Sequence, residues 1–216
     1  EDTMAGTASV LTDDSLLSRL DQRLFSIEKI LVFIGGLAIF SLMVLAVFSV
    51  GGRNFFNRPL SGYVDWIEQI MPLIAFVGIA YTQRVGGHIR MDILVGQLKG
   101  RPLWLAEFVA TLAMLLLMIL LVWGSWAHFQ RSFDFSVPMW SRDSSIDIAL
   151  PLWPAKLLAP VAFFILTLRL TIQLVGFGRA FATNATHPVA VPMVEDAATQ
   201  AQREAEHVSG LEEDSK

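Results

Sequence analysis

The chain lacks cysteine altogether, and only four of its 216 residues are histidine. The absence of cysteine excludes a disulfide framework, thiol redox chemistry and cysteine-ligated metal. A haem held between membrane helices would need histidines on facing helix interiors. The histidines instead fall in predicted loops, at a helix end or in the tail, at His88, His128, His187 and His207. The sequence therefore predicts no cofactor and no enzyme that depends on these ligands.

Charged residues are also scarce, at 17% of the chain against about 25% in ordinary soluble domains. Hydrophobic residues make up 54% and occur in long runs, so we predict an integral membrane protein. The first apolar run begins only near Ile30, and no small-residue cleavage site follows it. This pattern indicates a membrane anchor rather than a cleaved signal peptide.

Four segments are long and apolar enough to cross a bilayer, whose hydrocarbon core of about 30 Å needs about 20 helical residues. We expect spans at about 30–51, 63–83, 104–128 and 152–177. The third has an unbroken apolar core over residues 114–121, which is typical of a lipid-facing helix. The predicted fold is an all-α membrane domain over residues 15–182, between a flexible N-terminus (1–14) and a disordered acidic C-terminal tail (183–216).

The segment 15–31 precedes the first span and has the spacing of an amphipathic helix. Its apolar residues recur every three or four positions, with the charged residues mostly on other faces; they are Leu17, Leu20, Leu24, Ile27 and Leu31. We therefore expect an interfacial helix that leads into the first span. Asp13, Asp14 and Ser15 are its candidate N-caps.

Glycines at positions 51 and 52 suggest that the first span ends there and that residues 53–62 form a short loop. In the second span, a stripe of small and polar residues recurs at helical spacing: Glu68, Met71, Ala75, Gly78 and Thr82. Small residues let helices approach closely in membranes, so we expect this stripe to face another helix. Pro72 removes one backbone hydrogen bond, which predicts a bend at that position.

Several charges fall at or inside the expected membrane boundaries, where a lone charge is costly. Between Lys156 and Arg169 only 12 residues are uncharged, and the uncharged stretch that follows Glu68 has only 15 residues. Topology sorts these charges into two layers, each of which can neutralise itself. One holds Arg53, Glu68 and Lys156 at the outer rim, and the other holds Glu107, Arg169 and Arg84 at the inner rim.

The distribution of basic residues near the span ends predicts the orientation. Nine lie on the side of the termini and the middle loop: Arg19, Arg23, Lys29, Arg84, Arg90, Lys99, Arg101, Arg169 and Arg179. Five lie on the other side: Arg53, Arg58, Arg131, Arg142 and Lys156. Because cytoplasmic loops are enriched in lysine and arginine, we expect both termini in the cytoplasm.

A family resemblance rests on the order of several short motifs. Arg53-Asn54 closes the first span, Trp66-x-Glu68 opens the second, Gly78 lies within it, and His88-x-x-Met91-Asp92 follows it. The fourth span begins with Leu152-Trp153-Pro154-Ala155-Lys156. Over about residues 20–180 the chain resembles the small, DctQ-like membrane subunit of tripartite ATP-independent periplasmic (TRAP) transporters. The long acidic tail and the extended loop 131–150 depart from that pattern.

The resemblance implies a scaffold role in the bacterial inner membrane. In that family a larger membrane subunit carries the substrate and sodium sites, and a periplasmic binding protein delivers organic acids or similar small solutes. The resemblance assigns the family-like motif and partner interface to Trp66, Glu68, Ala75, Gly78, His88, Asp92, Trp153 and Pro154. The residues leave two alternatives open: an autonomous four-helix exporter that uses Glu68, and an interfacial enzyme that uses His88, Arg90 and Asp92.

Overall fold

The protein is described by a computed structural model, which covers residues 10, 13, 15–58, 60–84, 101–183 and 191. Its helices are α1 (Leu16–Phe56), α2 (Tyr63–Val77), α3 (Ile79–Arg84), α5 (Arg101–Ser132) and α6 (Trp153–Thr183), with a short 3-10 helix, η1 (Pro138–Trp140), between the last two. Within the described residues α1, α2 with α3, α5 and α6 are four candidate membrane spans, which confirms the predicted all-α membrane fold. The N-terminus and the acidic tail lie almost entirely outside these residues.

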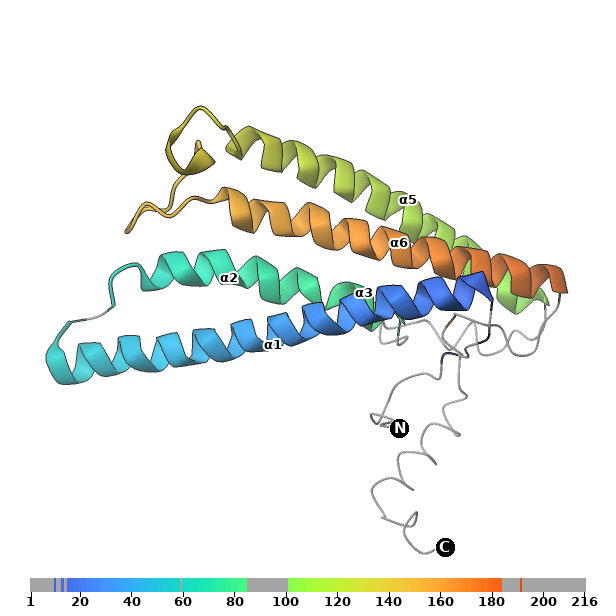
Figure 1. Ribbon diagram of the computed structural model, residues 1–216, viewed down its shortest axis with the longest axis horizontal. Coiled ribbons are helices and arrows are strands. Elements are labelled where there is room, and N and C mark those ends of the chain that lie inside the picture. The colour runs from blue at the N-terminus through green and yellow to red at the C-terminus, as the bar shows by residue number, and fades with distance from the viewer. Residues whose placement is uncertain are drawn as a thin grey trace, which may run out of the picture.

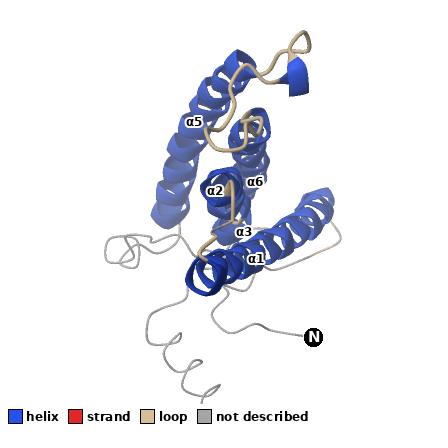
Figure 2. Cartoon of the chain, turned by 90° about the vertical axis from the view of Figure 1, so that its left-hand side faces the viewer, coloured by secondary structure: helices blue, strands red, loops and turns tan. Residues whose placement is uncertain are grey.

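The helices lie side by side in the order α5, α6, α2 with α3, and α1 (Figure 1). Viewed along the helices, α2 lies between α6 and α1, and α5 packs on the far side of α6 (Figure 2). Consecutive spans run antiparallel, so α1 and α5 begin at the end of the molecule where α6 finishes. We call this the converging end, because α1, α3 and α6 meet there. At the opposite, open end, α1 and α2 diverge.

The α1 helix is longer than predicted, because it includes both the amphipathic segment and the first span. Its 41 residues measure about 60 Å. Ser15 is the N-cap, as predicted, and its Oγ accepts the backbone N–H of Ser18 at 3.3 Å. The helix also continues through Gly51 and Gly52, where we expected it to end. In hydrocarbon an unsatisfied backbone group costs several kcal/mol, whereas glycine in a helix costs about 1 kcal/mol. Keeping the helical hydrogen bonds is therefore more favourable than ending the helix at the glycines.

The end of α1 makes use of one of these glycines. Asn57 adopts a left-handed φ of 52°, and the Arg58 N–H donates to the Gly52 carbonyl at 3.1 Å. The chain therefore folds back over the last turn of α1. A Cβ at position 52 would lie 2.7 Å from the Arg58 carbonyl oxygen, so this turn requires glycine.

The inward face of α1 is largely small or polar. Its buried residues are Ser18, Asp21, Leu24, Glu28, Gly35, Ala38 and Ser49. In the predicted apolar stripe only Leu24 is buried, and Leu20 and Ile27 are about half exposed. Apolar side chains gain little by leaving lipid, whereas buried carboxylates need partners, so charge and not hydrophobicity sets the rotation of this helix.

The second span is interrupted at Gly78, which separates α2 from α3. The helix passes through Pro72 without interruption, and the break lies six residues farther along the chain. Gly78 keeps helical dihedral angles, and its carbonyl accepts the backbone N–H of Thr82 at 3.0 Å. The interruption is therefore local, and α3 extends the span toward the converging end.

The pair α5 and α6 forms the most extensive helix contact. Leu166 and Leu170 of α6 are fully buried against Ala80 of α3 and against Met114, Leu115 and Met118 of α5. Nearer the converging end, Trp104 packs on Phe177 and Ala180. The prediction of a lipid-facing third span therefore holds for only one side of α5, where Leu116, Leu117, Ile119 and Leu120 are exposed.

Candidate functional site: a buried ionic cluster and an exposed helix face

A four-residue ionic cluster joins three helices near the converging end. It consists of Asp21 and Glu28 from α1, Arg84 from α3 and Arg169 from α6. The Arg169 guanidinium donates to both Glu28 carboxylate oxygens, at 2.8 and 2.7 Å, and a third bond reaches Asp21. Arg84 donates to the other Asp21 oxygen at 2.8 Å. Two carboxylates and two guanidinium groups leave the cluster without net charge.

The cluster lies deep in the protein. Arg169 is 0% exposed, and Asp21 and Glu28 are equally inaccessible. Along α6, Arg169 is 13 residues from Lys156, or about 20 Å, and it lies within the predicted fourth span, 152–177. A buried guanidinium is tolerated here because carboxylates accept hydrogen bonds from its Nε, Nη1 and Nη2.

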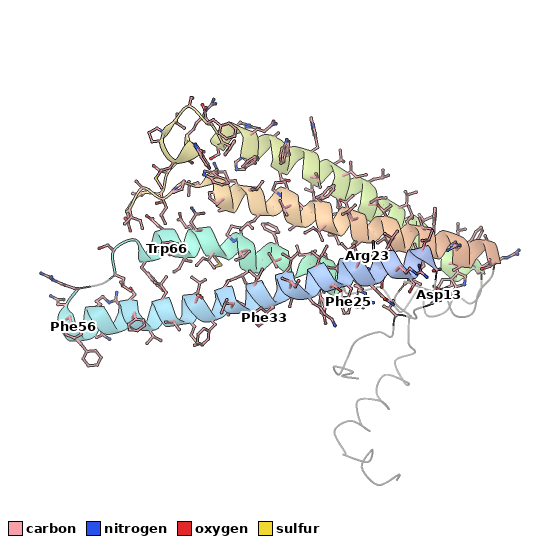
Figure 3. All side chains as sticks on the ribbon, in the orientation of Figure 1. Asp13, Arg23, Phe25, Phe33, Phe56 and Trp66 are labelled. Atoms are coloured by element: carbon pink, nitrogen blue, oxygen red, sulfur yellow. The ribbon has the colours of Figure 1, made fainter. Side chains whose placement is uncertain are left out.

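Aromatic and amide groups extend the cluster. The Arg84 guanidinium lies 3.7 Å from the centroid of the Phe25 ring, which stacks on Tyr81. Phe25 marks the place where α1 passes α3 (Figure 3). One turn farther along α6, Gln173 accepts a hydrogen bond from the Gln83 amide at 2.9 Å and donates back to the Gln83 carbonyl. The cluster and this amide pair fix the rotation of α1 and α3 relative to α6.

This arrangement differs from the predicted inner-rim layer. Arg84 and Arg169 do come together, but the carboxylates that bind them are Asp21 and Glu28. Glu107 is buried on α5. Asp21 and Glu28 were not among the predicted site residues, because their segment has the spacing of a helix at the membrane surface. A signal was present, since Asp21, Leu24 and Glu28 are spaced to share one helix face.

The predicted outer-rim layer is not formed in the described part of the chain. Arg53 lies exposed in the last turn of α1, and Lys156 pairs with Asp143 at 2.6 Å. The Glu68 side chain is exposed on α2 and has no hydrogen bond or ion pair within the described residues. The reason is geometric: α1 and α2 diverge at this end, and loop residue Asp143 reaches Lys156 first.

From Glu68 to Gly78 the predicted stripe faces away from the other described helices, whereas Thr82 is partly buried and its hydroxyl donates to the Gly78 carbonyl at 3.0 Å. Met71 is 56% exposed, Ala75 is exposed, and a Cβ added to Gly78 would meet nothing within 4 Å. Trp66, at the start of α2, is also exposed (Figure 3). The buried residues of α2 are Asp65, in its first turn, and Val77 at its end. The small-residue surface that we expected to pack on another helix is therefore open within this chain.

Asp65 is a third buried carboxylate that was not predicted from the sequence, after Asp21 and Glu28. It accepts the Ser145 hydroxyl at 2.6 Å and the Ile148 backbone N–H at 2.8 Å, and so holds the loop between α5 and α6 against the start of α2. Gly62 lies beneath Ile148, whose side chain would be 2.4 Å from a Cβ at that position. An acidic residue in the first turn of a helix was the available signal, but it is common for capping reasons alone.

The remaining predicted motif residues divide into two groups. Trp153 and Pro154 open α6, and the Trp153 indole N–H donates to the Met139 carbonyl at 3.1 Å. His88 and Asp92, together with Arg90, lie outside the described residues.

Comparison with known proteins gives one family match. The model of the DctQ component of tripartite ATP-independent periplasmic transporters matches residues 42–180. These residues contain α2, α3, α5 and most of α6, together with the loop held by Asp65. No curated protein matches the chain.

Proposed function

Because this chain belongs to the DctQ component family of tripartite ATP-independent periplasmic transporters, we propose that it is the small scaffold subunit, which braces a larger transport subunit in the bacterial inner membrane. In this role it moves no solute itself. The larger subunit imports organic acids or similar small solutes, coupled to sodium and delivered by a periplasmic binding protein. Both termini of the small subunit lie in the cytoplasm, as the distribution of basic residues indicates.

The observation that supports this proposal is the exposed face of α2, which lies next to helices that the ionic cluster holds together. The ionic cluster binds α1, α3 and α6 to one another, which suits a part that must keep its shape while another part moves. The face formed by Glu68, Met71, Ala75 and Gly78 lets another helix approach closely and presents one carboxylate to it. In lipid, small residues and polar groups are the features that drive helix association.

We assign this face to the larger subunit. A helix of that subunit lies along Ala75 and Gly78, and a cation of that subunit neutralises Glu68 at the rim. Trp66, Trp153 and Pro154 complete the proposed contact at the open end, and His88 and Asp92 belong to the same proposed motif. Arg53 and Lys156 supply cationic character to this end but are not the partners of Glu68 within the chain.

Co-purification tests the assignment most directly. Affinity-tagged protein from its native membrane should recover a much larger multi-span membrane protein. Ala75→Trp should lower that recovery about tenfold, since forcing bulk into a packed contact costs about 1–3 kcal/mol. Leu120→Trp, on the exposed side of α5, is the matched control and should recover the partner normally. Equal recovery with both variants would contradict the assignment of the α2 face.

The exporter alternative is tested separately. An autonomous exporter would need Glu68 in a central aqueous cavity, whereas Glu68 lies on the outer surface of α2. The chain alone in liposomes should therefore transport nothing. Solute uptake or efflux without a second membrane protein would overturn the scaffold proposal, whatever the result of the co-purification.

A further inference from the structure

The loop between α5 and α6 carries exposed aromatic side chains immediately beyond a membrane span. Residues 133–142, here called the aromatic hairpin, begin one residue after α5 ends and contain η1. Phe135 is 76% exposed, Met139 63% and Trp140 52%. Such apolar exposure in a loop calls for something that covers it.

The hairpin is ordered by contacts at its base. Phe133 pairs with Ser141 in an antiparallel bridge, and the Asp134 N–H donates to the Trp140 carbonyl at 3.1 Å. The Asp134 carboxylate binds the Arg142 guanidinium at 2.8 Å and also accepts the Ser136 hydroxyl. The exposed apolar side chains are therefore displayed by a fixed backbone.

The backbone at the tip is strained in a way that presents these side chains outward. Met139 and Trp140 both have a φ of 55°, in the left-handed region that non-glycine residues rarely adopt. The Trp153 indole N–H holds this conformation through the Met139 carbonyl. Backbone strain at the exposed apolar pair Met139 and Trp140 indicates that these residues have a function.

The residues of α5 next to the hairpin indicate what covers its exposed side chains. A continuous series of ring contacts runs from the exposed surface of α5 into the hairpin, through Trp126, Phe129, Phe133, Phe135 and Trp140. On α5 the lipid-type residues end at Trp126, and the exposed polar residues His128, Gln130 and Arg131 follow. This change marks the bilayer boundary, and tryptophan-rich apolar groups at that level are typical of the membrane–water interface.

The hairpin is also two-sided. Asp134, Ser136 and Arg142 form its polar side, where the pKa of the Asp134 carboxyl is lowered to about 2 by hydrogen bonds from Ser136 and Arg142. Phe135, Met139 and Trp140 form its apolar side. A charged side that remains ionised and an apolar side that is exposed suit a segment lying in the plane of the interface.

We propose that the aromatic hairpin is an interfacial anchor, which inserts Phe135, Met139 and Trp140 into the headgroup and acyl boundary of the bilayer while Ser136 stays in water. The partner is the lipid surface itself, and no other protein is required. The anchor fixes the depth and tilt of α5 and α6 at the open end.

The absence of cysteine from the whole chain allows a clean test. Single cysteines at Phe135, Met139 and Ser136 in the full-length protein would each carry a spin label, with the protein in phospholipid nanodiscs. Accessibility to oxygen, which concentrates in lipid, is compared with accessibility to a water-soluble nickel complex. Leu120→Cys on α5 is the lipid-facing reference. Melting temperatures within the wild-type range show that each labelled protein is folded.

We expect oxygen to exceed nickel at positions 135 and 139, at a depth of about 5–10 Å, and nickel to exceed oxygen at position 136. Nickel access at 135 and 139 would show that the tip lies in water and would overturn the proposal. Low access to both reagents would show a protein covering and would also overturn it. Oxygen preference at all three positions would overturn the two-sided placement. Two separate tip variants keep the test decisive if one fails to fold.

Discussion

Removing one member of the ionic cluster should destabilise this protein far more than removing a surface ion pair. In Arg169→Met, Asp21 and Glu28 remain buried, with Arg84 bound to Asp21 as the one remaining cation of the cluster, so the cluster changes from neutral to a net charge of −1. Breaking a buried pair in this way costs about 3–5 kcal/mol. For a chain of this size about 1 kcal/mol lowers the melting temperature by about 2–4 °C, so a loss of about 6–20 °C is expected.

The chain offers a matched control in Arg142→Met. Arg142 makes an ion pair with Asp134 at the same distance, 2.8 Å, that separates Arg84 from Asp21, but its side chain is 57% exposed. Exposed pairs contribute about 0–1 kcal/mol. Thermal unfolding in detergent, followed by tryptophan fluorescence, should therefore separate the two variants clearly.

A second variant distinguishes charge imbalance from lost packing. Glu28→Gln combined with Arg169→Met removes one carboxylate and one cation, which restores neutrality in the cluster. Part of the stability lost in Arg169→Met should return, and a double-mutant cycle gives the coupling energy. Equal melting temperatures for Arg169→Met and Arg142→Met, or simple additivity in the cycle, would refute the reasoning.

Three further predictions concern the open end and the orientation. Gly62→Ala should destabilise the protein by about 1–3 kcal/mol, because its Cβ would meet the Ile148 side chain at 2.4 Å in a backbone with φ of 73°; an unchanged melting temperature would contradict this. The pKa of Asp134 is lowered from 3.8 to about 2, so its contribution to hairpin stability should be complete above pH 3.8 and lost only as the pH falls through about 2. A spin label at Phe135, which leaves Ser136 and Arg142 in place, should therefore keep its mobility from pH 7 to pH 3, and mobilisation near pH 4 would count against the hydrogen bonds described. Reporter fusions should place Ser136 outside the cytoplasm and Thr183 inside, and the reverse pattern would overturn the proposed orientation.

The lengths of apolar runs were sufficient to predict the spans, because bilayer thickness fixes how many helical residues must be uncharged. The predicted end of α1, by contrast, was wrong. Gly51 and Gly52 look like a break to rules derived in water, where exposed backbone groups can bond to solvent. Inside hydrocarbon they cannot, so the helix continues to Phe56.

The candidate site was predicted less well than the spans, although its cations were found. Arg84 and Arg169 were identified as costly charges that need carboxylates, and both are paired. Their partners were not identified, because Asp21 and Glu28 lie in a segment whose apolar spacing suggested a membrane-surface helix. Glu68 was expected to bind cations of its own chain, and the structure leaves its carboxylate on an exposed helix face.

The sequence by itself determined that this is a four-span helical membrane protein whose buried charges must be paired, since both conclusions follow from the cost of placing polar groups in hydrocarbon. Only the tertiary structure decided which charges meet. In water, an apolar stripe reveals the inward face of a helix, but in lipid both faces can be apolar and the stripe loses that meaning. The rotation of α1 about its axis, which brings Asp21 and Glu28 to Arg169, depends on contacts among three helices and is encoded in no single segment.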